Sequence, residues 1–294
     1  MELQWPLIIF TLFMCLGAGI LFAAGLAAVR GEDDAVKLPS IVATTACMVL
    51  GGFASALHLH HWERIFNGFG HLTSGITHEL IGIVVVMAAV ILYFALFRGK
   101  KTAKWMGVVA MAASVLLIVL MTHSYAMPAR PVWNVPFMYL VYLGNMGLFG
   151  FLSLGIMGAA TKSDTSFAMK AALVSGVVQL IGCLGFATLV TGLADSFSSL
   201  GYYFMSTDPS APLKDPGVAL LGLTSFDLGL IYWGVTVLIG CVVPLAAAVV
   251  LGLRKGEGDR ACGVMVAALA CALVGGVAFR MVFFLLGYSQ YVFY

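Results

Sequence analysis

Long apolar runs alternate with short polar segments along the whole chain. Each run is long enough to cross a hydrocarbon core of about 30 Å as a helix. The alternating pattern of a membrane β-barrel strand is absent, and in lipid a helix satisfies its backbone hydrogen bonds within its own segment. The pattern predicts an all-α fold for residues 1–294, a single bundle of eight transmembrane helices at about 6–29, 38–60, 78–97, 105–127, 137–160, 166–191, 226–253 and 261–288.

The composition agrees with lipid as the main solvent of this protein. Hydrophobic residues make up 62% of it and charged residues only 10%, a balance that a water-soluble domain of this length does not have. The six cysteines lie within apolar runs, and no two of them form a CxxC pair. The sequence therefore predicts neither a zinc site nor an iron–sulfur site in this protein.

The basic residues are distributed unequally between the two sets of loops. The odd-numbered loops and their flanks hold eleven Lys and Arg residues, whereas the even-numbered loops hold only Arg64, Arg130 and Lys214. Cytoplasmic loops carry the excess of positive charge. We therefore expect the odd loops inside and both termini on the outer, periplasmic side.

With this orientation, the polar residues that could carry chemistry gather at the outer boundary. The densest cluster runs from Leu57 to Asn67 at the end of the second span, and Thr77-His78-Glu79 follows at the start of the third. Ionisable residues at membrane depth are functional candidates. An imidazole can accept a proton from a hydroxyl and release it to water, and a nearby carboxylate can take it onward. These groups, beside an apolar slot, suit the oxidation of a quinol.

Structural roles compete with the functional one at several outer positions. His60, His61 and His71 are typical of interfacial histidines, and Trp62 is typical of an aromatic belt. His123 fits either role.

Two further interpretations concern a salt bridge and a haem. Arg280, amid the aromatic residues of the last span, fits a structural salt bridge to Asp227 or Glu79 as well as it fits a site. A single outer haem between His58 and either His123 or His78 is a further alternative. We expect no haem, because the inner side lacks the second histidine pair of a transmembrane dihaem anchor.

Three segments resemble the membrane anchor subunits of dimethyl sulfoxide reductases, the DmsC family. Gln4–Thr11 resembles the family's EWPLIxFT start, and Leu57–Glu79 resembles its LHLGxPxRAFNxL segment followed by SxLSxE. Ser124–Asn134 is similar to a tyrosine followed by Pro-x-Trp. Eight spans with both ends outside also match the family, so the resemblance covers essentially the whole sequence.

The resemblance implies roles for individual residues. It places the family's quinol-binding histidine at His58 and its functional acidic residue at Glu79, with Arg64 and Asn67 as the family's arginine and asparagine. We predict that His58 and Glu79 are the catalytic proton acceptors. The predicted quinol-binding residues are His58, Arg64, Asn67, Glu79, Tyr125 and Arg280.

The sequence departs from the family pattern at three places. His60 replaces a glycine and Trp62 a proline. The segment Arg280–Phe284 only approximates an RxxFY ending, and the glutamate expected before it is missing. These departures leave the quinone preference open.

The resemblance also implies a cofactor and partners. The protein would be the anchor of a three-subunit complex in the bacterial cytoplasmic membrane that oxidises menaquinol, with no haem, iron–sulfur cluster or molybdopterin of its own. An iron–sulfur electron-transfer subunit would dock on the outer face, with a molybdopterin catalytic subunit beyond it, and no nucleic acid would take part.

Three alternatives remain from the sequence. The protein could anchor a related oxyanion or polysulfide reductase, or serve as a scaffold that binds no quinol. A small-molecule transporter would need polar residues near the middle of the bilayer and on both faces, whereas here they crowd one face.

Overall fold

The computed structural model describes residues 3–58, 70–71, 73–197, 216–254 and 259–289, and these residues form helices and loops without any β-strand. Within these described ranges, eight helical segments are long and apolar enough to cross a membrane, which confirms the predicted all-α fold class and the predicted eight spans. Seven of them are α1 (Trp5–Arg30), α2 (Lys37–His58), α3 (Gly75–Phe97), α4 (Lys104–Tyr125), α5 (Phe137–Ala160), α6 (Ser166–Gly192) and α10 (Asp259–Leu285).

The remaining span, Phe226–Gly252, is built from three helical pieces. It begins with α8 (Phe226–Gly229), continues as the π-helix η5 (Leu230–Val242) and ends with α9 (Val243–Arg254). Short helices precede it: η2 (Ala194–Phe197), α7 (Pro216–Leu221) and η4 (Gly222–Thr224). A π-helix is uncommon and usually lasts a single turn, so the apolar run predicted this span but not its winding.

The helix ends follow from local residue chemistry. Pro6 occupies the first turn of α1, where its missing N–H costs no hydrogen bond. Gly31 ends the same helix with φ 78°, and its N–H donates to the carbonyls of Ala27 and Ala28. This left-handed conformation favours glycine.

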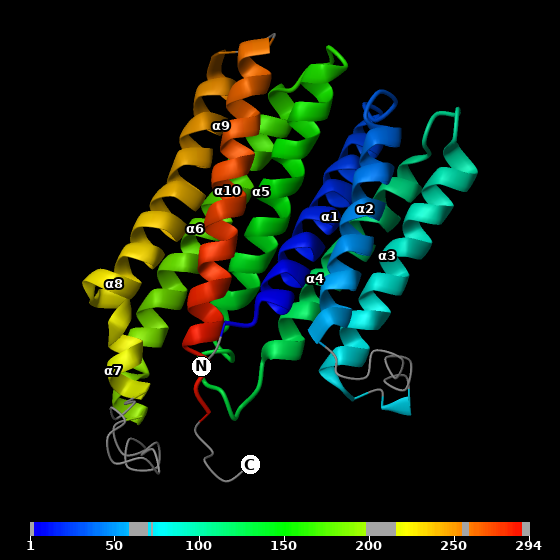
Figure 1. The fold of residues 1–294 in the computed structure, drawn as a ribbon. Helices are drawn as coiled ribbons and strands as arrows, with labels where there is room; N and C mark the ends of the chain where they lie inside the picture. Colours follow the sequence, from blue (N-terminus) through cyan, green and yellow to red (C-terminus); the bar gives the residue numbers. More distant parts are fainter. Residues whose placement is uncertain (1–2, 59–69, 72, 198–215, 255–258, 290–294) are drawn as a thin grey trace.

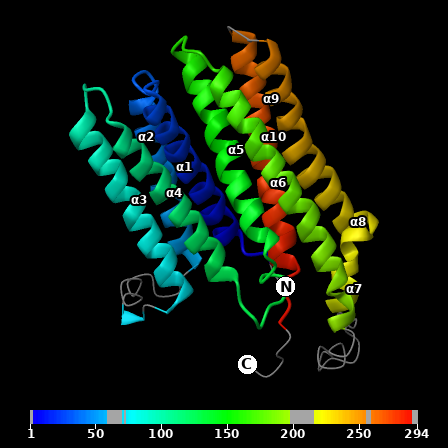
Figure 2. The same cartoon turned by 180° about the vertical axis from the view of Figure 1, so that it is seen from behind.

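The spans run up and down through the bundle, and both termini lie at the same end (Figure 1). α2 ends and α3 begins at this terminal end, where the α4–α5 connection also lies, and the α1–α2, α3–α4 and α5–α6 loops lie at the opposite end, as the view from behind also shows (Figure 2). The molecule is therefore a multi-pass membrane protein, and its described connections lie alternately at the two ends of the bundle.

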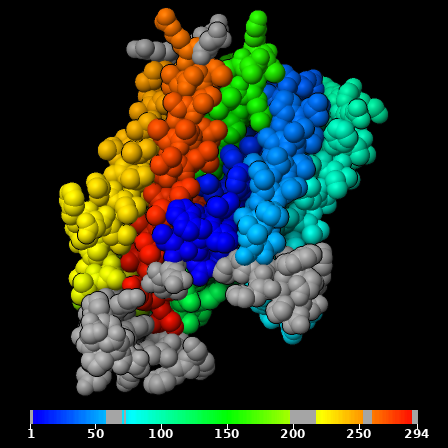
Figure 3. All heavy atoms as spheres, viewed as in Figure 1, coloured from blue at the N-terminus to red at the C-terminus, as the bar shows by residue number. Residues whose placement is uncertain are grey.

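Helices α1 and α5 form the centre of the bundle. α1 packs against α2, α4 and α5, while α5 packs against α6 and α10. At the terminal end α1 is wedged between α10 and α2 (Figure 3). Large apolar side chains such as Phe53, Val174 and Leu238 are exposed on the outer helices, as expected for surfaces that face lipid.

Glycines permit the closest helix contacts. A Cβ on Gly19 of α1 would lie 2.0 Å from the carbonyl oxygen of Met146, and one on Gly150 would lie 2.0 Å from the carbonyl oxygen of Gly19. Gly240 of η5 meets Gly275 of α10 in the same manner, because a Cβ on Gly240 would lie 2.5 Å from the Cα of Gly275. Close approach of this kind is how helices gain packing energy in lipid.

Candidate functional site

The predicted site residues lie at the terminal end of the bundle or in segments outside the described residues. His58 is the last residue of α2, and its side chain is not among those described. Arg64 and Asn67, like His60, His61 and Trp62, fall within 59–69 and lie outside the described residues. The side chains of Glu79, Tyr125 and Arg280 are described, and each comes from a different helix.

The first turn of α3 and the last turn of α4 bring two pairs of polar residues together. Ser124 on α4 hydrogen-bonds Oε1 of Glu79 on α3. The preceding residues in each helix also pair, since the ring centroids of His78 and His123 are 6.3 Å apart. His123 Nδ1 lies 3.1 Å from Tyr139 Oη of α5, and His123 is exposed whereas Glu79 is partly buried.

The hydrogen bonding of Ser124 depends on the protonation state of Glu79. Ser124 Oγ is also 2.8 Å from the carbonyl oxygen of Met121. A hydroxyl has one proton to donate, and a carbonyl can only accept. When Glu79 is ionised, Ser124 can donate to its carboxylate. When Glu79 is protonated, the carboxyl can donate to Ser124 while Ser124 donates to Met121. Both states therefore have a satisfied arrangement, as a group that accepts and releases protons requires.

Tyr125 connects this pair to the core of the bundle. Its side chain is buried and lies close enough to Glu79 and Arg280 to interact with both electrostatically. Its ring contacts Trp133, Phe283 and Phe284 edge to face, each at a centroid distance of 5.8 Å. These aromatic contacts fix the tyrosine against Trp133 and the end of α10.

The segment after α4 fastens onto the end of α10. Trp133 Nε1 donates to the carbonyl of Phe283 at 2.9 Å, and Arg130 Nη1 donates to the carbonyl of Gly287 at 3.1 Å. The Arg130 guanidinium also lies 4.2 Å from the centre of the Trp133 ring, and burial lowers the pKa of Arg130 from its usual value. The Pro-x-Trp similarity was visible in the sequence, but the partner of this segment was not.

Arg280 is completely buried, and its side chain donates hydrogen bonds to groups of α1, α5 and its own helix α10. A guanidinium has five N–H donors, and the structure supplies five acceptors from α1, α5 and α10. They are Thr11 Oγ1 at 2.8 Å from Nε, Asn145 Oδ1 at 3.2 Å and the Gly276 carbonyl at 2.9 Å from Nη1, and the Thr11 carbonyl at 3.2 Å and Cys15 Sγ at 3.1 Å from Nη2. These contacts give Arg280 a structural role in joining α1, α5 and α10.

The salt bridge considered for Arg280 is wrong for the described residues. The ion pairs found there join Arg30 to Glu32 and Lys37 to Asp33 and Asp34, so neither Asp227 nor Glu79 is an ion-pair partner of Arg280. Neutral acceptors and the face of the Tyr142 ring, 4.8 Å from the guanidinium carbon, hold the charge instead.

Two polar atoms beside Arg280 have no hydrogen-bond partner in the described part of the protein. They are Tyr142 Oη and Asn145 Nδ2, both buried in α5. The described residues contain no group of three or more His, Cys, Asp or Glu side chains that could hold a metal ion, and all six cysteines are free thiols. The described chemistry is therefore that of a carboxyl, hydroxyls, imidazoles and a buried guanidinium.

The comparisons with known proteins agree with the motifs. No family model matches the sequence. The protein is 27% identical over 197 residues to YnfH, an anaerobic dimethyl sulfoxide reductase subunit of Escherichia coli K12, covering 63% of this protein and 68% of the relative. It is also 27% identical over 206 residues to the C subunit of anaerobic dimethyl sulfoxide reductase from the same strain, covering 63% and 71%. The predicted resemblance is thereby confirmed: the protein is a homologue of the membrane anchor subunits of anaerobic dimethyl sulfoxide reductases.

Proposed function

We propose that this protein anchors a dimethyl sulfoxide reductase-type molybdoenzyme complex in the bacterial cytoplasmic membrane and oxidises menaquinol at its outer face. The single observation that carries the proposal is the Glu79–Ser124 pair at the terminal end of α3 and α4. It offers a proton acceptor with a hydrogen-bond partner in both protonation states, at the boundary where α2 ends in His58.

The proposed reaction removes two protons and two electrons from the quinol and leaves a quinone. Glu79 and His58 accept one hydroxyl proton each, and His78 and His123 lie beside Glu79 as a route to water. The two electrons pass to an iron–sulfur subunit docked on the same face, and a molybdopterin subunit beyond it uses them to reduce the terminal acceptor. Arg64, Asn67 and Tyr125 would position the quinol, and Arg280 would fix the helices behind it.

The distribution of charge supports this sidedness. The even-numbered loops of the sequence hold Arg64, Arg130 and Lys214, whereas the odd-numbered loops and their flanks hold eleven basic residues. The positive-inside rule places the end rich in basic residues in the cytoplasm. Protons accepted at Glu79 then leave on the outer side. An alkaline phosphatase fused to the C-terminus should be active, and an inactive fusion combined with cytoplasmic labelling of the 57–79 segment would contradict the scheme.

The role of Glu79 can be tested in the purified three-subunit complex with two electron donors. A menaquinol analogue must be oxidised by the anchor, whereas a reduced viologen can deliver electrons to the soluble subunits directly. Since a positioned proton acceptor contributes roughly 10²- to 10⁴-fold to a rate, Glu79→Gln should lower the quinol-driven rate at least tenfold and leave the viologen-driven rate unchanged. Glu79→Asp should retain part of the quinol-driven rate.

Glu32→Gln is a matched control, because Glu32 is an exposed carboxylate at the opposite end that pairs with Arg30. It should leave both rates unchanged. Undiminished quinol oxidation by Glu79→Gln would overturn the assigned role. A wild-type complex that reacts with the viologen but with no quinol would favour the scaffold interpretation instead.

A further inference from the structure

An apolar groove runs between α2 and α3 on the half of the bundle away from the termini. α2 is held mainly by α1, and α3 mainly by α4, so these two neighbours pack only lightly against each other. The groove between them has a volume of about 740 Å³. Its walls include Val42, Ala46 and Val49 of α2 and Met87 and Ile91 of α3, and these side chains offer a ligand only apolar contact.

A basic cavity of about 470 Å³ continues the groove at the bundle end opposite the termini. The two hollows share Leu38, Ile41 and Phe94 as lining residues, so they adjoin and together form one candidate site. The charged residues around the cavity are Lys37, Arg98, Lys100, Lys101 and a single carboxylate, Asp34. The site therefore joins an apolar trough to a mouth with a formal excess of positive charge.

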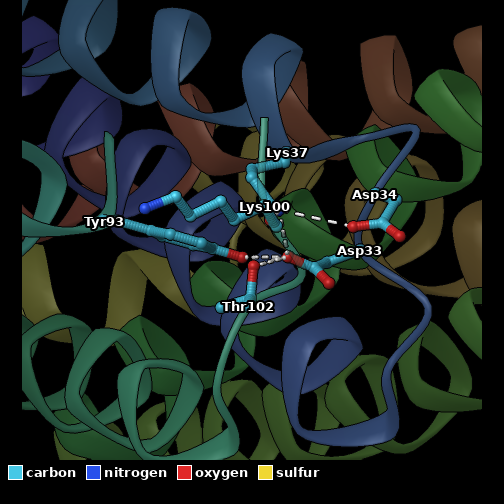
Figure 4. Close-up of polar contacts among 6 residues, drawn as sticks. All are labelled: Asp33, Asp34, Lys37, Tyr93, Lys100 and Thr102. Atoms are coloured by element: carbon cyan, nitrogen blue, oxygen red, sulfur yellow. Dashed lines mark hydrogen bonds and ion pairs between the residues drawn. The ribbon is translucent and has the colours of Figure 1, made fainter. Parts of the chain in front are cut away.

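A buried network fixes the geometry of this mouth (Figure 4). Asp33 is almost completely buried in the α1–α2 loop, where it accepts hydrogen bonds from Tyr93 Oη at 2.8 Å and from the Thr102 hydroxyl. Lys37 Nζ lies 3.6 Å from Asp33 and donates to the carbonyl of Lys100 at 2.8 Å. The network thus joins the α1–α2 loop, the end of α3 and the α3–α4 loop.

The side chain of Lys37 is engaged in this network, but the charged groups of the other basic residues of the mouth are not. Arg98, Lys100 and Lys101 are exposed, and no described carboxylate lies within ion-pair distance of any of them. The guanidinium of Arg98 lies over its neighbour Phe94, 5.2 Å from the ring centre. Phe94 also lines both hollows, so the positive charge of Arg98 lies where the groove meets the mouth.

The length of the groove matches one acyl chain. Leu38 and Leu50, both lining residues, are twelve residues apart on α2, which is about 18 Å at roughly 1.5 Å per residue. One leaflet occupies about half of a hydrocarbon core of about 30 Å. From this fit and from the charge, we propose that the α2–α3 groove binds an anionic phospholipid, with an acyl chain along α2 and the phosphate at Arg98, Lys100 and Lys101.

The charge of the mouth separates this lipid from the other membrane ligand considered for this protein. A quinol is uncharged and gains nothing from three cations that no described carboxylate neutralises, whereas a phosphate does. The proposal is also independent of the quinol chemistry, because the groove and Glu79 lie at opposite ends of α3. Each proposal can therefore fail without the other.

Native mass spectrometry of the purified full-length protein, titrated with phosphatidylglycerol or phosphatidylcholine of identical acyl chains, tests the proposal. The wild-type protein should bind one phosphatidylglycerol at least tenfold more tightly than phosphatidylcholine. The double variant Arg98→Gln/Lys101→Gln should lose most of this preference, because each basic residue near a membrane surface strengthens the binding of anionic lipid roughly fivefold. Filling the trough with Ala46→Phe should weaken the binding of both lipids.

The matched control is Lys162→Asn/Lys170→Gln, which removes two exposed positive charges at the same bundle end, outside the groove. Asparagine at position 162 tolerates the φ of 56° found there. This control should keep the preference. Equal binding of the two lipids by the wild-type protein, equal losses in the two double variants, or displacement of the phospholipid by inorganic phosphate or a quinol analogue would overturn the proposal.

Discussion

The hydrogen bonds around Arg280 predict that the Thr11 hydroxyl alone makes a measurable contribution to the stability of the folded protein. Thr11 Oγ1 accepts the Nε–H bond at 2.8 Å, and both residues are completely buried. Thr11→Val keeps the shape of the side chain but replaces the acceptor with a methyl group. The variant therefore leaves one N–H of a buried guanidinium without a partner, in a site that excludes water.

The expected loss follows from the charge of the donor. A hydrogen bond to a charged group contributes about 1.5–3 kcal/mol, and an unsatisfied buried donor carries its full desolvation penalty. We expect Thr11→Val to lower the free energy of unfolding by about 2 kcal/mol. In an Arg280→Met background the same substitution removes no bond to a cation, so the two changes should couple by about 1–2 kcal/mol. The coupling is diagnostic, because replacing a buried charge by an apolar group of similar volume can by itself be neutral.

Unfolding in mixed micelles with increasing sodium dodecyl sulfate, followed by circular dichroism, measures these differences. The control is Thr122→Val, since Thr122 is also buried and its hydroxyl donates only to the Ile118 carbonyl of its own helix at 2.7 Å. It should cost much less than Thr11→Val. Equal losses at the two threonines, or strict additivity with Arg280→Met, would refute the assignment of Arg280 as a helix clamp.

Three further changes test other parts of the packing by the same unfolding assay. Gly19→Ala should destabilise the bundle by about 3 kcal/mol or more, because its Cβ would collide with backbone of α5, whereas Gly263→Ala has no neighbour within 4 Å and should be neutral or slightly stabilising. Tyr93→Phe should lower the free energy of unfolding by about 1–3 kcal/mol, because Asp33 loses a buried donor. No change in this free energy would show that the network does not stabilise the basic mouth. Trp133→Phe should cost about 1 kcal/mol through its lost bond to α10, and no loss would show that this bond adds nothing to stability.

The spans were predictable from the sequence because lipid imposes one strong rule. The backbone N–H and C=O groups of a single span in hydrocarbon must form hydrogen bonds within their own helix. An apolar run of sufficient length therefore predicts a transmembrane helix by itself. The predicted run at 105–127 corresponds to α4 at Lys104–Tyr125, and the run at 137–160 to α5 at Phe137–Ala160. The π-helix within the seventh span was not predictable, because its apolar sequence fits either helical winding equally well.

The site was only partly predictable, because its partners are neutral and distant in sequence. Glu79 stood out as an acidic residue at a membrane boundary, but Ser124 gives no such signal, and only the packing of α4 on α3 brings them together. For Arg280 the sequence pointed to a carboxylate, whereas the structure uses Thr11 and Asn145, which lie 269 and 135 residues away. A neutral acceptor leaves no charge pattern from which it could be inferred.

Polar contacts tie down both ends of α3. In lipid no hydrophobic force drives helices together, and only 28% of the most apolar stretch of α3 is buried inside the bundle. At one end Glu79 is bonded to Ser124 of α4, and at the other Tyr93 is bonded to Asp33 of the α1–α2 loop. A phospholipid in the groove would support the same helix from its open side. The quinol site and the lipid site would then be separate in chemistry while sharing one helix, so removal of the lipid should loosen α3 without altering the groups that accept protons.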